Sequence, residues 1–467
     1  MKAFKYFVVG ALLSVAAPTM AQEADFGKAL APISQAMKEN PASVEKQAKE
    51  FIKNYKKNPE AILALGSTYL AAKNFDKADE LAEMILSRNK KDMKVQAEAY
   101  ILKGDIEAVK DVTGNGGKAA EHYATAKSLD PKNPTAYMRY ASVYRNINPA
   151  VTEQTYEELR REVPDFPIEA EAAHTFFSGN KFDKAFANFS KCDRNNLSET
   201  NLVEYVISAV QLNKYADALN VANFGATKFP ENATFSQLGL WSAVETEKFA
   251  EAESIAKKFM TMKGDKNATD YTYYGKALMG LQKYEEALSM FNKALEVNKD
   301  ATEPLAKISE TYTKMGQEDK ALEYSEMYLA KNSKASIIDY ANIAQIYVNK
   351  AEKGDKIANL EKALSIYDKM VEKFPDYATW TNGIAAGIAD KAGKEDLGAQ
   401  YNQKIVDELG NKENLNENQK GYLVQALKKL GYYYWGEKNN LDAAKPYYEK
   451  LIKFEPEDKN AKAALGL

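Results

Sequence analysis

The residues of this chain best suited to metal binding or acid–base catalysis are two histidines, His122 and His174, and one cysteine, Cys192. They lie far apart in the sequence and show none of the short His and Cys spacings of a zinc site. No Gly-x-Ser-x-Gly motif is present to position a serine nucleophile. Residues 114–118 are rich in glycine but lack the first glycine and the final hydroxyl of a phosphate-binding loop. The sequence therefore predicts a protein that is not an enzyme and that has no cofactor and no metal.

A second group of residues repeats along the chain, and its spacing indicates binding rather than catalysis. An aromatic residue is followed by two mostly polar residues and an alanine. The four clearest copies lie at 182–185, 215–218, 249–252 and 284–287, and their alanines are 33, 34 and 35 residues apart. A period in this range is typical of a solenoid, in which stacked helix pairs present one extended surface.

The same register extends over most of the chain when it is aligned on one small residue in the second helix of each repeat. The aligned positions are Ala78, Ala119, Thr152, Ala185, Ala218, Ala252, Ala287, Ala321, Ala363, Gly398 and Ala444. Proline often ends a repeat twelve residues later because it cannot continue a helix, as at Pro131, Pro164, Pro230, Pro375 and Pro456. First helices place a small residue before a bulky one, as in Leu65-Gly66 with Tyr69 and Leu430-Gly431 with Tyr434.

These residues resemble the pattern of the tetratricopeptide repeat (TPR) family, in which a bulky-Leu-Gly-Tyr helix precedes an Ala-x-x-x-Phe helix and a proline. The resemblance implies an all-α TPR α-solenoid, a right-handed superhelix of about 11 helix-turn-helix repeats with terminal capping helices. We assign residues 60–456 to the TPR array. Residues 22–59 are predicted to form an N-terminal helical cap or degenerate repeat, and residues 457–467 a C-terminal capping helix.

Three intervals between aligned positions are longer than the others. We expect their extra residues to form loops near 113–117, 351–355 and 411–418. The Thr152 repeat is degenerate, because Asn148-Pro149 interrupts it.

In the TPR family the first helices line the concave wall of the superhelix. The resemblance implies that this wall receives the positions three before, one after and four after the small residue of each first helix. The predicted partner-binding residues are His174, Phe177, Ile207, Val210, Trp241, Val244, Lys276, Met279, Tyr432 and Trp435. The apolar middle of the wall suits a partner segment, with Trp241 and Phe177 as anchors. The alternatives are a tight superhelix, whose wall residues pack against one another, and a one-residue error in register.

The first 21 residues have the composition of a signal peptide. Lys2 and Lys5 precede an apolar run at 6–17 that is too short to span a bilayer, and residues 19–21 supply the small side chains of a cleavage site. Gln22 stands where a lipoprotein has its cysteine. We therefore expect an exported, periplasmic protein with no transmembrane segment. Peripheral association with the envelope is compatible with this expectation.

The charge of the chain argues against a nucleic-acid partner. Its 63 Lys and Arg and 66 Asp and Glu residues give a formal net charge of −3, whereas nucleic-acid binding needs clustered cations. The predicted function is a non-catalytic periplasmic scaffold or adaptor that captures a protein or peptide segment on the concave surface. Two alternatives stay open: binding of a glycan or cell-wall polymer, and an architectural role in an outer-membrane assembly or secretion complex. The oligomeric state is also open.

Overall fold

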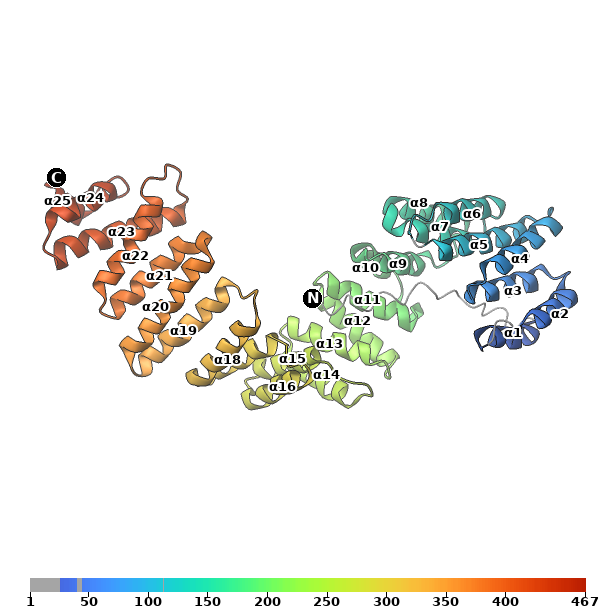
Figure 1. The fold of residues 1–467 in the computed structure, drawn as a ribbon, viewed down its shortest axis with the longest axis horizontal. Helices are drawn as coiled ribbons and strands as arrows, with labels where there is room; N and C mark the ends of the chain where they lie inside the picture. The colour runs from blue at the N-terminus through green and yellow to red at the C-terminus, as the bar shows by residue number, and fades with distance from the viewer. Residues whose placement is uncertain (1–25, 40–43, 112) are drawn as a thin grey trace. The chain divides into compact units, whose positions relative to one another are not determined.

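The computed structural model describes residues 26–39, 44–111 and 113–467, and the predicted signal peptide at residues 1–21 lies outside them. Twenty-five α-helices and no β-strand form in this described part, which confirms the all-α solenoid (Figure 1). Internal contacts divide the chain into two compact units, Met1–Thr246 and Glu247–Leu467.

The helices of the first unit are α1 (Gly27–Glu39), α2 (Glu45–Tyr55), α3 (Pro59–Ala71), α4 (Phe75–Arg88), α5 (Met93–Lys110), α6 (Gly117–Leu129), α7 (Pro134–Ile147), α8 (Pro149–Glu162), α9 (Ile168–Ser178), α10 (Phe182–Phe189), α11 (Glu199–Gln211), α12 (Tyr215–Lys228) and α13 (Ala233–Glu245), with a 3₁₀ turn η4 (Arg194–Asn196). Those of the second unit are α14 (Phe249–Thr261), α15 (Ala268–Gly280), α16 (Tyr284–Val297), α17 (Glu303–Lys314), α18 (Glu318–Lys331), α19 (Ile337–Lys353), α20 (Lys356–Lys373), α21 (Ala378–Lys391), α22 (Glu395–Leu409), α23 (Glu417–Tyr432), α24 (Leu441–Leu451) and α25 (Lys459–Leu465), with η5 (Pro375–Tyr377) and η6 (Tyr433–Glu437).

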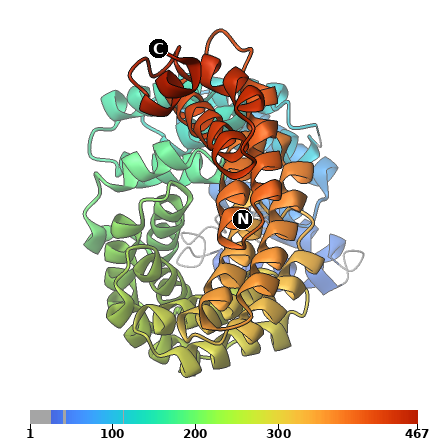
Figure 2. The same cartoon turned by 90° about the vertical axis from the view of Figure 1, so that its left-hand side faces the viewer.

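Successive helices pack as hairpins, and each hairpin contacts the next one. In the first unit α3 pairs with α4 and the series continues to α11 with α12; in the second unit it runs from α15 with α16 to α23 with α24. Figure 2 shows the stacking of the helices drawn in orange and red in the second unit. The aligned small residues of the second helices are buried, and Ala78, Ala218, Ala287 and Ala444 are each 0% exposed.

The small residue of a first helix makes room for an aromatic ring of the second helix. A Cβ added to Gly275 would lie 2.4 Å from Cε1 of Phe291, and one added to Gly431 would lie 2.6 Å from the ring of Tyr448. Such distances are impossible without displacement of the ring, so glycine permits the close crossing. The rings occupy the position four residues after the aligned alanine, where the sequence pattern also places a large side chain.

A left-handed residue turns the chain between the two helices of most hairpins, five residues before the aligned small position. Positive φ occurs at Lys73, Gly114, Asn180, Asn213, Glu247, Gln282, Gly316, Gly393 and Asn439. At the α15–α16 turn, the Lys283 amide donates to the Leu278 carbonyl at 2.9 Å and the Gln282 amide to the Met279 carbonyl at 3.0 Å. The first is the six-to-one bond and the second the five-to-two bond of a Schellman turn, and together they satisfy carbonyls left over at the helix end.

Two hairpins differ from the others in length by one residue: the α7–α8 hairpin is one residue shorter, and the α23–α24 hairpin is one residue longer before its left-handed Asn439. Between α7 and α8, Asn148 both ends the first helix and caps the second, and Pro149 starts α8, so this turn has no left-handed residue. At the end of α23 the backbone instead widens into one π-helical turn, η6, which takes up an additional residue before α24. The interrupted Thr152 repeat is therefore a shortened hairpin.

The predicted loop at 351–355 is wrong for most of its length. α19 continues to Lys353, only Gly354 and Asp355 form the turn, and α20 starts at Lys356. The extra residues lengthen both helices, because Ala351 is buried and Leu360 packs in the same core cluster. The other two insertions lie at the expected places, between α5 and α6 and between α22 and α23.

Candidate functional site

Three first helices of the first unit place most of the predicted apolar residues on one surface. α11 contacts both α9 and α13. We call the partly buried apolar residues at these positions of α9, α11 and α13, together with Met138 at the equivalent position of α7, the apolar wall. They all pack against one core cluster and are Met138, Ala170, Phe177, Val203, Ile207, Val210 and Trp241.

The wall residues are neither fully buried nor fully exposed, which is the condition of a surface that can still bury area against a partner. Phe177 also packs edge-on against Phe182 of its own hairpin, with ring centroids 5.7 Å apart. Val244 differs from Trp241, the wall residue on the same helix, because Val244 is only 6% exposed. Its side chain therefore offers little surface to a partner.

His174 lies among the wall residues of α9 and is held by a carboxylate of α11. Its Nδ1 lies 2.8 Å from Oε1 and 3.0 Å from Oε2 of Glu204. Glu204 is 6% exposed, while 40% of the His174 side chain is accessible. The hydrogen bond to Glu204 raises the pKa of His174, against the opposing effect of burial. A half-buried ion pair therefore lies beside the apolar wall when the imidazole is protonated.

Glu204 is not among the partner-binding residues predicted from the sequence. It occupies the position two before the small residue of α11, outside the three positions that were read as wall. A signal was present, since Glu204 is an acidic residue in the otherwise apolar stretch Val203–Val210 of α11. A charged side chain within such a stretch indicates a buried partner of opposite charge.

The remaining predicted residues lie on two separate helices of the second unit. On α15, Nζ of Lys276 is 3.1 Å from Oε1 of Glu303, and the sulfur of Met279 accepts a hydrogen bond from the Thr311 hydroxyl at 3.4 Å. Tyr432, at the end of α23, is 57% exposed. Trp435 in η6 packs edge-on against Tyr448, with centroids 6.1 Å apart. Along the chain, α16 to α22 lie between α15 and α23.

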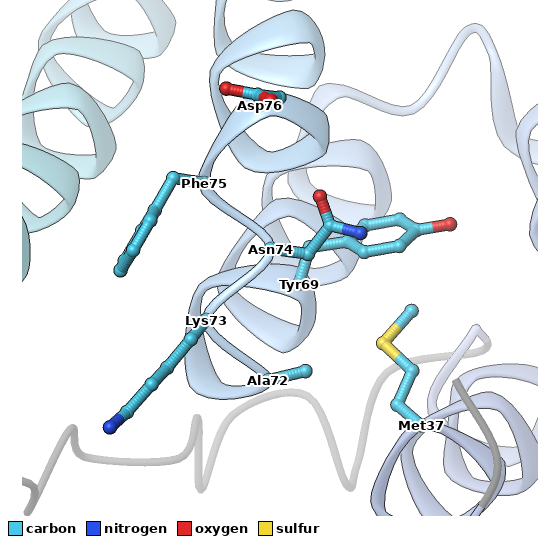
Figure 3. A pocket seen from close by; sticks show the side chains of 7 residues that line it. All are labelled: Met37, Tyr69, Ala72, Lys73, Asn74, Phe75 and Asp76. Atoms are coloured by element: carbon cyan, nitrogen blue, oxygen red, sulfur yellow. The ribbon is translucent and has the colours of Figure 1, made fainter. Parts of the chain in front are cut away.

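A hollow of about 360 Å³ lies at the turn between α3 and α4. It is lined by Met37, Tyr69, Ala72, Lys73, Asn74, Phe75 and Asp76. Figure 3 shows that these side chains point in different directions, whereas an active site needs polar groups that converge. The described residues contain no group of three or more potential metal ligands. None of the helices among them is long and apolar enough to cross a membrane.

Comparison with known proteins connects the hairpins to a repeat family. Residues 271–300 and 424–458 match the family model described as Tetratricopeptide repeat. These segments contain the α15–α16 hairpin and most of the hairpin formed by α23 and α24. No curated protein is significantly similar to this chain.

Several solved structures resemble the chain at low identity. The C-terminal part of a TPR repeat-containing protein from Cytophaga hutchinsonii is 19% identical and covers 57% of this chain and 100% of its own, with a TM-score of 0.46. MamA MSR-1 is 15% identical and covers 36% of this chain and 97% of its own, with a TM-score of 0.33. The APC/C hetero-tetramer Cut9-Hcn1 is 13% identical and covers 95% of this chain and 89% of its own, with a TM-score of 0.29.

Proposed function

We propose that this chain, in which two segments match the Tetratricopeptide repeat family model, is a non-catalytic scaffold that captures a segment of another protein on the apolar wall. The observation that carries the proposal is that partly buried apolar side chains of α7, α9, α11 and α13 all pack against one core cluster. A partner segment that covers them removes apolar area from water at about 25 cal/mol per Å².

Phe177 and Trp241 are the proposed anchors. Both are large aromatic side chains that already pack on the core with one part of their surface. Such residues dominate binding energies because they bury much area while they lose little conformational freedom. Several weaker contacts along the wall then act together.

We place this scaffold in the periplasm, soluble or peripheral to the outer membrane. The support is the basic, apolar and small-residue order of residues 1–21. Fractionation of cells that produce the full chain tests this placement. Release of the shortened protein with the periplasmic fraction is the expected result, and a full-length protein retained in the cytoplasm contradicts it.

Site-specific photo-crosslinking tests the wall. A photoreactive amino acid at position 210 on the wall is expected to capture a partner in intact cells, whereas the same probe at Asn220, exposed on α12, is not. The double variant Phe177→Ala/Trp241→Ala should lose this product. Tyr377→Ala is the matched control, because it removes an exposed aromatic side chain from η5. Equal crosslinking at positions 210 and 220, or capture that survives the double variant, contradicts the proposal.

A glycan is the second candidate ligand, and the exposed ring of Tyr432 is the observation that favours it. A Cβ on Gly436 would lie 2.9 Å from Cε2 of Tyr432, so the glycine lets the ring lie against η6. Aromatic faces bind sugar rings through apolar contact. Retention on purified cell-wall polymer that is lost in Tyr432→Ala supports this candidate, and unchanged retention in that variant removes it.

A further inference from the structure

Arg145 of α7 is a cation of the first-helix face that has no acidic partner among the described residues. Its Nη1 donates only to its own helix, to the carbonyl and, at 2.8 Å, to the hydroxyl oxygen of Ser142. Its Nε is buried without an acceptor in the described part of the chain. Burial lowers the pKa of the guanidinium. Arginine stays charged at any physiological pH, so the charge is partly desolvated and not compensated.

Other cations on first helices have carboxylates close by. Lys103 of α5 lies 2.9 Å from Asp79, Arg139 of α7 lies 3.1 Å from Asp105, and Lys428 of α23 lies 2.5 Å from Glu455. Lys276 on α15 is paired with Glu303 in the same way. Arg145 therefore differs from these four cations.

Arg145 lies beside the apolar wall. An added Cβ on Gly179, two residues after Phe177, would lie 3.4 Å from Cβ and Cγ of Arg145, so the arginine stem packs at the end of α9. Arg145 also lowers the pKa of His174 by like-charge repulsion, which places the two cations within electrostatic reach. Glu204 compensates His174, and nothing comparable compensates Arg145.

We propose that Arg145 and the adjacent apolar wall together bind a partner segment in which an acidic side chain lies next to a large apolar side chain. This inference rests on the proposed scaffold function and names the chemistry of the segment. The carboxylate supplies the counter-charge that Arg145 lacks, through charge-assisted hydrogen bonds to its free N–H groups. The apolar side chain covers Phe177 and its neighbours. The half-buried position of Arg145 strengthens the attraction, because water screens it less than at an exposed site.

The test uses two short synthetic peptides and the chain without the predicted signal peptide, residues 22–467. In the first peptide glutamate alternates with phenylalanine; in the second glutamine replaces each glutamate. Both have acetylated and amidated ends, so that only side-chain carboxylates differ. We expect the glutamate peptide to bind the wild-type chain roughly tenfold more tightly or better, the ratio that one or two charge-assisted hydrogen bonds supply.

Substitution of Arg145 identifies the group responsible. Arg145→Gln should remove the preference for glutamate and leave the affinity for the glutamine peptide unchanged within about twofold. Arg145→Lys keeps the charge and should retain part of the preference. Arg161→Gln, on the exposed side of α8, is the matched control and should behave as wild type. Circular dichroism of each variant verifies that the helices remain folded.

Each outcome decides the inference. Equal binding of the two peptides to the wild-type chain, with loss in Phe177→Ala/Trp241→Ala, overturns it while the scaffold proposal stands. A preference for glutamate that persists in Arg145→Gln also overturns it. So does the absence of binding by either peptide at about 1 mM, and the crosslinking experiment then decides separately whether the wall has a protein partner. Tighter binding of oligoguluronate, an acidic glycan, than of the glutamate peptide assigns the site to a sugar instead and overturns it too.

Discussion

The imidazole Nδ1 of His174 lies 2.8 Å from Oε1 of Glu204, and this contact joins α9 to α11, the first helices of two consecutive hairpins. It connects the stability of the first unit to pH, because the hydrogen bond raises the pKa of His174 above its ordinary value of 6.5. The chain has two histidines, and the other one, His122, provides a natural comparison.

We predict that the stabilisation from His174 is complete below pH 6.5 and is lost as the pH rises through the folded-state pKa, since a raised pKa means that folding favours the protonated ring. Urea unfolding of the wild type and His174→Gln from about pH 5.5 to about pH 8.5 measures this. The difference between their free energies of unfolding should shrink with rising pH. A difference that stays constant over this range contradicts the prediction.

His122 should show the opposite sign. Burial lowers the pKa of His122, so folding favours its neutral ring. Its favourable contribution is present above the ordinary pKa of 6.5 and is lost as the pH falls through the folded-state pKa. The same titration of His122→Gln therefore serves as the control, and parallel behaviour of the two variants would show that neither histidine has the assigned environment.

A methyl group at Gly275 should destabilise the second unit. Its Cβ would lie 2.4 Å from the fully buried ring of Phe291, so Gly275→Ala is expected to cost about 1–3 kcal/mol through overpacking. Gly421→Ala on α23 is the matched control, because nothing lies within 4 Å of its added Cβ. The free energy of unfolding of that variant should rise by about 1 kcal/mol, because alanine has a higher helix propensity than glycine. Denaturant unfolding of both variants measures the contrast, and a loss of stability in both contradicts it.

The left-handed turn residues should respond to glycine in a predictable direction. Gln282 has φ of 61° and Gly316 has φ of 70° at equivalent turns. Gln282→Gly should stabilise the second unit by about 0.5–1 kcal/mol, because glycine adopts positive φ without a Cβ clash. Gly316→Ala should cost about 1 kcal/mol for the same reason. Thermal unfolding of the pair gives the test, and shifts of the same sign would contradict the role assigned to this position.

Removal of two buried tyrosine hydroxyls should have unequal effects. The Tyr123 hydroxyl donates to the Asp105 carboxyl at 2.7 Å, whereas the Tyr156 hydroxyl lies 2.6 Å from the neutral hydroxyl of Thr175. Tyr123→Phe should cost about 1.5–3 kcal/mol and Tyr156→Phe about 0.5–1.5 kcal/mol, because bonds to charged groups contribute more. Urea unfolding at neutral pH compares them, and a larger loss for Tyr156→Phe would contradict the assignment.

The helix pairs could be predicted from the sequence because their signal is local. Each aligned small residue, such as Ala218 or Ala287, is buried inside one hairpin, and proline marks the end of several repeats. The missing residue at Asn148 and the additional residue at η6 could not be placed in this way. The repeat spacing shows that a hairpin is longer or shorter, but not whether its turn or its helix changes length.

The surface was harder to predict because it depends on contacts between hairpins. The period places Val210 and Val244 at equivalent positions, yet Val244 is 6% exposed and Val210 remains partly accessible. Glu204 was missed for the same reason, since its partner His174 belongs to the preceding hairpin. A pattern within one repeat does not reveal which side chains of the next repeat will meet it.

The π-helical turn at Tyr433–Glu437 has a consequence for how this array can vary in length. Gly431 still packs against Tyr448, as Gly275 packs against Phe291, although an additional residue lies between them. The widened turn absorbs the insertion within a single helix end and returns the following helix to its proper phase. In a globular core an insertion of one residue would shift every later contact. Here its effect is confined to one helical turn.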